Sequence, residues 1–201
     1  MFGAARLNNL TKYAATGRTA ATVTANGNAS VSTNVPKFGT GKLLLDGTGD
    51  YINVSAPTSV GSGAFTLEFW VRFSPTAPGT RSNSTWQMAY SVVGNNNSYV
   101  LLWSNYIQLG INGSFGSFAL GSTMAGNTWY HIAVVRSADY KVYFNGTDCG
   151  TAIDDGGWSL RSNTHDFCPT SGYWFGGYVN GSTKGIVGGM DEIRISNTAR
   201  Y

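Results

Sequence analysis

Residues 65–73 read FTLEFWVRF, and this run constrains the fold more than any other part of the chain. Successive side chains of a β-strand point to opposite faces of a sheet, so a strand here has two different faces. One face carries Phe65, Leu67, Phe69, Val71 and Phe73, and the other carries Thr66, Glu68, Trp70 and Arg72. We expect the first face to lie in a core between two layers and the second to be partly solvated.

The composition predicts an all-β protein. Glutamate occurs only twice and lysine five times, whereas the chain holds 27 glycines and 13% aromatic residues. The chain therefore mixes residues that favour turns with residues that fit a half-buried sheet. Further strands are expected at 42–45, 51–54, 87–93, 99–103, 106–111, 129–136, 140–145, 173–177 and 190–195, and no helix is expected. A chain of 201 residues fits one domain with a full core.

Five short motifs resemble one family. They are DGTGDYI at 46–52, FTLEFWV at 65–71, WYHIAVV at 129–135, KVYFNG at 141–146 and GMDEIRI at 189–195. Their wording and order resemble the laminin G-like domains of the concanavalin A-like lectin–glucanase superfamily, over about residues 40–201. The resemblance implies a two-sheet antiparallel jelly-roll sandwich. It does not imply one activity, because a single fold supports many functions.

The closing segment narrows the resemblance. Residues 191–201, DEIRISNTARY, resemble the closing strand of laminin G-like domains in virion proteins of tailed phages. The module type is extracellular, yet residues 1–13 lack the apolar stretch of a secretory signal peptide. A virion protein reconciles these observations, because virions assemble in the cytoplasm and leave by lysis. We therefore predict a structural protein on the virion surface, either a capsid decoration protein or a fibre or appendage subunit.

Two spans follow from this interpretation. Residues 1–35 are predicted to be an N-terminal arm and edge strand that could dock on the particle, and residues 36–201 the sandwich. The alternative is a secreted or cell-surface carbohydrate-binding module of a larger bacterial protein.

Charge limits the expected partners. Only 11% of the residues are charged, and the net charge of +3 reflects scarce acids and not a basic run. Nucleic acid is therefore not an expected partner. No apolar stretch approaches the roughly 20 residues of a membrane span, so no membrane insertion is expected. Low charge and exposed strand edges favour a homo-oligomer or a lattice member, with other virion proteins, copies of the chain and surface glycans as partners.

Catalysis is not expected. Glycoside hydrolysis needs two facing carboxylates, which the resembling enzymes supply from one strand as E-x-D-x-x-E. Glu68 stands alone on its strand, and the neighbours Asp191 and Glu192 would point to opposite faces. We expect Glu68 to pair with Arg72 or another base. His165 and Asp166 lie near Ser162, but no nucleophile elbow accompanies them.

Aromatic residues are the candidates for glycan binding, because an aromatic face stacks on the apolar side of a sugar. The candidates are Trp86, Trp103, Tyr106, Trp158, Tyr173 and Tyr178. Trp158 and Tyr178 are expected to be exposed. The alternative for tryptophans such as Trp70, Trp129 and Trp174 is packing in the core or on a sheet face.

Two further sites are predicted. The resemblance implies calcium, with Asp191 on the closing strand and Asp46 or Asp50 as helpers. The alternative for Asp191 is a bond to the backbone of a turn. A disulfide between Cys149 and Cys168 would close a Gly/Ser/Asn-rich segment, and two reduced cysteines are the alternative.

Overall fold

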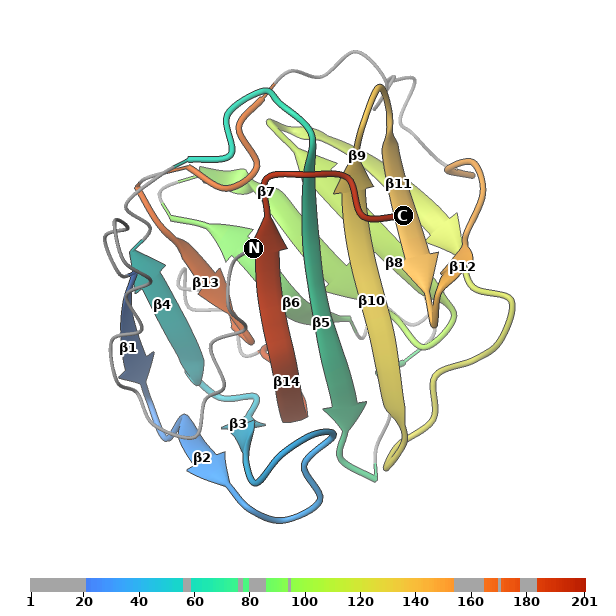
Figure 1. Ribbon diagram of the computed structural model, residues 1–201. Coiled ribbons are helices and arrows are strands. Elements are labelled where there is room, and N and C mark those ends of the chain that lie inside the picture. Colours follow the sequence, from blue (N-terminus) through green and yellow to red (C-terminus); the bar gives the residue numbers. More distant parts are fainter. Residues whose placement is uncertain are drawn as a thin grey trace.

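The computed structural model describes residues 21–55, 59–75, 78–79, 86–93, 95–153, 165–169, 171–177 and 184–201. They form two antiparallel sheets of seven strands that pack face to face (Figure 1). The predicted all-β, two-sheet sandwich is confirmed. In the part of the chain that the structure describes, no helix is long and apolar enough to span a lipid bilayer.

The strands of each sheet follow one another in a fixed spatial order. Sheet A is ordered β1 (Thr22–Asn26), β4 (Tyr51–Ser55), β13 (Tyr173–Phe175), β6 (Gln87–Val92), β7 (Asn95–Leu102), β8 (Tyr106–Ile111) and β9 (Ser114–Ala119). Sheet B is ordered β12 (Thr147–Asp148), β11 (Tyr140–Phe144), β10 (Trp129–Arg136), β5 (Phe65–Phe73), β14 (Val187–Ser196), β3 (Lys42–Asp46) and β2 (Ser30–Ser32).

The core lies between the sheets and follows the alternation of β5. All five side chains of its predicted core face are completely buried. They meet apolar side chains of sheet A such as Tyr90, Leu102 and Ile107. Burial of this kind contributes roughly 1.5–3 kcal/mol per large apolar side chain.

The opposite face of β5 corrects the expectation of partial solvation. Trp70 and Arg72 are half-buried as expected, but Thr66 and Glu68 are buried. The cause is the segment 197–201, which crosses the outer side of sheet B over β5 and β10 (Figure 1). Thr66 Oγ1 donates a hydrogen bond to the carbonyl of Thr198 and accepts one from the backbone N–H of Arg200. We call residues 197–201 the C-terminal arm.

The span predicted as an N-terminal arm and edge strand supplies an outermost strand to each sheet. β1 pairs with β4 at the edge of sheet A, and β2 pairs with β3 at the edge of sheet B. Residues 1–20 lie outside the described residues. Three strands, β2, β9 and β12, were not predicted from the sequence.

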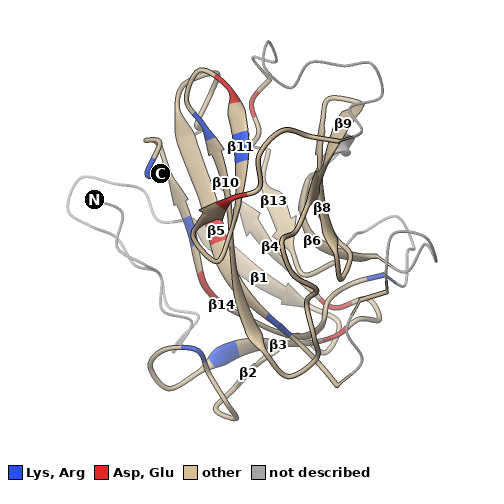
Figure 2. Cartoon of the chain, turned by 90° about the vertical axis from the view of Figure 1, so that its right-hand side faces the viewer, with Lys and Arg blue, Asp and Glu red and all other residues tan. Residues whose placement is uncertain are grey.

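Charge is distributed unequally between the sheets. None of the seven strands of sheet A contains Lys, Arg, Asp or Glu, whereas every strand of sheet B except β2 contains at least one. In Figure 2 the strands β6, β8 and β9 accordingly carry neither charge colour, and both colours lie along sheet B. The two outer faces of the sandwich therefore offer different chemistry.

Both cysteines are free thiols, so the predicted disulfide is not formed in this structure. The thiols have different neighbours: Cys149 follows the edge strand β12 of sheet B, whereas Cys168 lies 3.4 Å from the hydroxyl of Tyr90 on β6 of sheet A. Burial raises the pKa of Cys149 to about 11 and that of Cys168 to about 12.

Thiol titration tests this arrangement. We expect almost no reaction with Ellman's reagent in the native state at pH 8, because the reactive thiolate is disfavoured at both positions. Two thiols per chain should react in 6 M guanidinium, and one in Cys149→Ser. Absence of reactive thiols in guanidinium without reductant would instead establish the disulfide.

Candidate functional site

The outer face of sheet A carries a second apolar cluster, separate from the core. Strand alternation produces it: Val100 and Leu102 of β7 point into the core, so Tyr99 and Leu101 point outward. The cluster consists of Trp86, Met88, Tyr99, Leu101, Trp103 and Tyr106, which we call the aromatic face. Trp86, Tyr99 and Tyr106 are half-buried, whereas Trp103 is only 6% exposed and backs them.

Uncharged polar groups border the aromatic face. Tyr99 donates its hydroxyl proton to Gln108 Oε1 at 3.3 Å, and Gln108 Nε2 donates to Ser117 Oγ at 3.2 Å. Gly110 lets the Tyr99 ring lie flat on β8, since a Cβ at this position would come within 2.4 Å of the ring. Among the described residues, the buried Ser91 Oγ has no hydrogen-bond partner. A buried hydroxyl group without a hydrogen-bond partner destabilises the folded state.

The face continues toward β4 through Trp174. This residue is opposite Ser91 on one side and Asn53 on the other. Its ring meets that of Tyr51 edge to face, with centroids 6.1 Å apart. Lys184 lies at the other end, with its Nζ 4.5 Å from the centroid of Trp86.

The structure brings together three of the six predicted glycan-binding residues. Trp86, Trp103 and Tyr106 all belong to the aromatic face. Tyr173 does not, because its ring packs in the core against Tyr90 and Phe175, and this corrects the expectation for it. Trp158 and Tyr178 lie outside the described residues. Tyr99 was missed, although its alternation with Val100 and Leu102 signals an outward position.

The predicted calcium ligands are occupied by the backbone. Asp191 Oδ2 accepts hydrogen bonds from the N–H groups of Lys37 and Phe38, at 2.8 and 3.1 Å, as the turn alternative requires. Asp50 accepts from the N–H groups of Asn28 and Asp46.

These carboxylates are also separated. Asp46 is opposite Val187, four residues before Asp191 on β14, which corresponds to roughly 13 Å along an extended strand. No group of three or more His, Cys, Asp or Glu side chains suited to a metal lies among the described residues. Asp46, Asp50 and Asp191 therefore do not fit one shared calcium ion.

The outer face of sheet B is organised around Glu68, which is only 3% exposed. Arg194 Nε donates to Glu68 Oε1 at 2.7 Å, and the hydroxyl of Tyr201 donates to Oε2 at 2.8 Å. His131 Nε2 lies 3.2 Å from the same Oε2, and Arg200 Nε lies 3.3 Å from Oε1. The predicted pairing with a base is present, but the bases are Arg194 and Arg200, since Arg72 contacts Asn127 instead.

This environment keeps Glu68 ionised. Burial alone would raise its pKa, but the hydrogen bonds from His131, Tyr201 and Arg194 outweigh burial and lower the pKa to about 2. A general acid needs a pKa near the operating pH. Glu68 therefore cannot serve as a proton donor at neutral pH, and its oxygens are already occupied.

The comparisons with known proteins agree with this fold. A family model described as the concanavalin A-like lectin/glucanases superfamily matches residues 46–201. The chain belongs to this superfamily. A search of curated protein sequences finds no match.

Solved structures with this fold include three whose names denote a binding domain or a pentraxin. The binding domain of Paraclostridial Mosquitocidal Protein 1 has a TM-score of 0.67 at 13% identity, over 90% of this chain and 45% of that chain. The botulinum neurotoxin serotype G binding domain has a TM-score of 0.62 at 16% identity, over 92% of this chain and 45% of that chain. The heptameric SAP-like pentraxin from Limulus polyphemus has a TM-score of 0.51 at 16% identity, over 69% of this chain and 65% of that chain.

Identities this low establish the sandwich fold alone, and the chain spans less than half the length of the two toxin binding domains. The superfamily's name covers both lectins and glucanases. For this member of the superfamily, the choice between them rests on the side chains described above.

Proposed function

We propose that the chain is a non-enzymatic glycan-binding domain displayed on the surface of a phage virion. The observation that carries the binding part is the aromatic face of sheet A. It combines three partly exposed aromatic rings with hydroxyl and amide groups, on a sheet whose strands contain no charged residue. Rings that stack on sugar C–H faces, beside neutral hydrogen-bonding groups, suit an uncharged saccharide.

The state of the carboxylates supports a non-catalytic role. Glu68 is ionised and engaged by three basic side chains, and Asp191 accepts backbone hydrogen bonds. A glycosidase needs one carboxyl group that can give up a proton and another that is free to attack or to activate water. Neither of these side chains is available for such a task.

Placement on a virion rests on sequence. The segment 191–201 resembles the closing strand of laminin G-like domains in tailed-phage virion proteins. In the structure this same segment supplies Arg194, Arg200 and Tyr201, the partners of Glu68. The resemblance thus falls on residues that hold the outer face of sheet B together. Docking through residues 1–35 would leave the aromatic face free.

A glycan array tests the binding part. The wild-type chain should bind neutral bacterial surface saccharides, and Trp86→Ala and Tyr106→Ala should each weaken binding about tenfold or more, which corresponds to roughly 1.4 kcal/mol. Val35→Ala is the control, because it truncates an exposed apolar side chain beside sheet B. Unchanged binding in both aromatic variants would contradict a site on the aromatic face.

Purified particles test the virion part. Mass spectrometry should detect the chain in stoichiometric copies, and electron microscopy should place it on a capsid or an appendage. Finding it within a larger secreted polypeptide would instead establish the cell-surface carbohydrate-binding module.

A further inference from the structure

Five rings form a continuous row across the outer face of sheet B. Their centroids are separated by 5.8 Å for Phe38 and Trp70, 5.2 Å for Trp70 and His131, 6.0 Å for His131 and Tyr201, and 5.1 Å for Tyr201 and Tyr143. The row runs from the loop between β2 and β3, over β5 and β10, to β11. Its most open members are Phe38 at one end, which is 48% exposed, and Tyr201 next to the other end, which is 47% exposed. We call the five residues Phe38, Trp70, His131, Tyr201 and Tyr143 the ring row.

Buried carboxylates fix the ring row in place. Glu68 lies beneath it and binds both His131 and Tyr201. Asp191 fixes the other end through the backbone N–H groups of Lys37 and Phe38. The rings therefore need little ordering when a ligand arrives, and preorganisation of this kind favours affinity.

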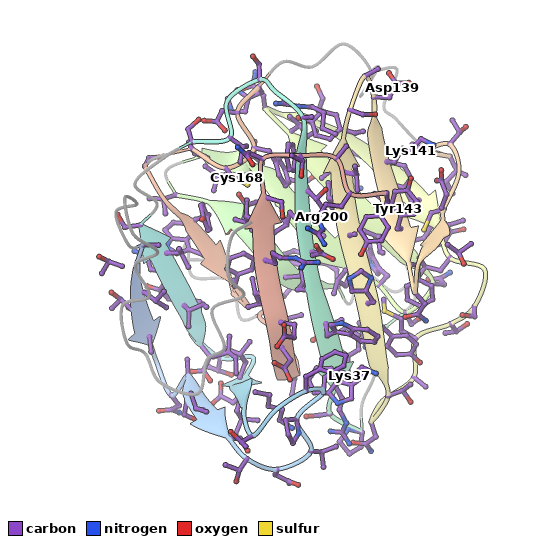
Figure 3. All side chains as sticks on the ribbon, in the orientation of Figure 1. Lys37, Asp139, Lys141, Tyr143, Cys168 and Arg200 are labelled. Carbon is purple, nitrogen blue, oxygen red and sulfur yellow. The ribbon has the colours of Figure 1, made fainter. Side chains whose placement is uncertain are left out.

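Basic side chains gather on the same face. The described residues include eight Lys and Arg side chains, and six of them are on the outer side of sheet B: Lys37, Lys42, Arg72, Lys141, Arg194 and Arg200. Figure 3 shows Lys37, Arg200 and Lys141 spread across this side. Lys37 Nζ lies 4.0 Å from the centroid of the Trp70 ring, and Arg200 is 42% exposed in its side chain.

The acids of this face do not balance the exposed cations. Glu68 and Asp191 are buried and already bonded. Asp148 is engaged by Lys141 at 2.9 Å, and Asp46 is the last residue of β3. Glu192 is half-buried at the irregularity of β14 between Asp191 and Arg194. Among the described residues, no carboxylate is paired with Lys37, and only Glu68 is paired with Arg200. The accessible surface is therefore aromatic and cationic.

We infer that the outer face of sheet B binds an anionic polysaccharide laid along the ring row. Aromatic rings accept the C–H faces of successive sugars, while Lys and Arg bind their carboxylates. A row that spans five segments of the chain suits a polymer more than a single sugar. A second copy of the chain, docked face to face, would bring like charges together. This site is independent of the proposed neutral-glycan site on sheet A.

Binding to polygalacturonate tests the inference, with neutral dextran as the comparison polymer. The full chain should bind polygalacturonate and not dextran in isothermal titration, and raising NaCl from 50 to 500 mM should weaken binding because the charges are screened. Lys37→Gln, Arg200→Gln and Tyr143→Ala should each weaken binding at least fivefold. Lys184→Gln removes the same charge beside Trp86 and should bind like the wild type.

Folding and association are measured in parallel. Circular dichroism should show that each variant keeps the wild-type fold, and Trp86→Ala should retain polygalacturonate binding, which separates this site from the aromatic face. No binding at 50 mM NaCl, or an equal loss in Lys184→Gln, would overturn the inference. So would a wild-type dimer in sedimentation velocity that Tyr143→Ala dissociates without any polysaccharide binding, because the face would then be an interface between copies.

Discussion

Glu68→Gln is expected to lower the free energy of unfolding by about 3 kcal/mol at neutral pH. The pKa of Glu68 falls from 4.5 to about 2 in the folded chain, and each unit corresponds to about 1.4 kcal/mol. The amide keeps the shape of the side chain but removes the charge that Arg194 and Arg200 engage. For a domain of this size, the midpoint of thermal unfolding should fall by roughly 6–12 °C.

The same substitution predicts a pH dependence. A carboxyl group whose pKa is lowered by folding stabilises the native state above its unfolded pKa, and this contribution disappears as the pH falls through its folded pKa. The difference in unfolding free energy between wild type and Glu68→Gln should therefore be largest above about pH 5 and should shrink progressively toward pH 2. Urea unfolding at pH 7 and pH 3 measures it.

Glu192→Gln is the matched control. Glu192 is the other glutamate of the chain, and it is half-buried on β14 beside Asp191. We expect a change below about 0.5 kcal/mol in this variant. If Glu68→Gln were equally mild, the cluster on sheet B would be no more stabilising than an ordinary surface ion pair.

Arg136→Ala should be at least as damaging as Glu68→Gln, with a loss of roughly 3–5 kcal/mol. Arg136 is 4% exposed, and its guanidinium donates to the carbonyl oxygens of Gly61, Gly63 and His165. It also donates to the hydroxyl of Tyr140 at 2.9 Å. Removing the guanidinium group leaves several buried acceptors without donors, and each unsatisfied group costs about 1–3 kcal/mol.

Arg136→Lys distinguishes the contribution of the guanidinium donors from that of the positive charge. The ammonium keeps the positive charge but cannot reproduce the planar set of donors, so most of the loss should remain. Arg72→Ala is the control, because Arg72 is half-buried on the outer face and bonds only Asn127 among the described residues. Equal stability of Arg136→Lys and wild type, measured by urea unfolding, would show that charge alone is required.

The sequence predicted the parts of the fold that local alternation specifies. The strands β5, β8 and β10 have the predicted bounds, because apolar and outward-facing positions alternate clearly in them. β9 has the sequence SFGSFA, in which serine and glycine give little strand preference, and it forms by pairing along β8. β2 and β12 contain only three and two residues, and their neighbours define them.

The candidate sites were predictable to a lesser degree. Trp86, Trp103 and Tyr106 were predicted as sugar-stacking aromatic residues on neighbouring loops and strands, and the structure gathers them on one face. β13 contains only Tyr173, Trp174 and Phe175, and three adjacent aromatic residues do not reveal which of them points inward. The burial of Glu68 depends on Tyr201, which is 133 residues away. No local pattern near residue 68 could indicate that cover.

The position of β14 has a consequence for folding during synthesis. β14 lies between β5 and β3 in the middle of sheet B, although it is the last described strand in the sequence. Glu68 is separated from Arg194 by 126 residues, and at ribosomal speeds this interval lasts roughly 6–25 s. Throughout it, β5 and β3 keep unpaired edges open to other chains. Newly made chains should therefore depend on chaperones, or on a low local concentration of other chains, until the central strand emerges and closes the sheet.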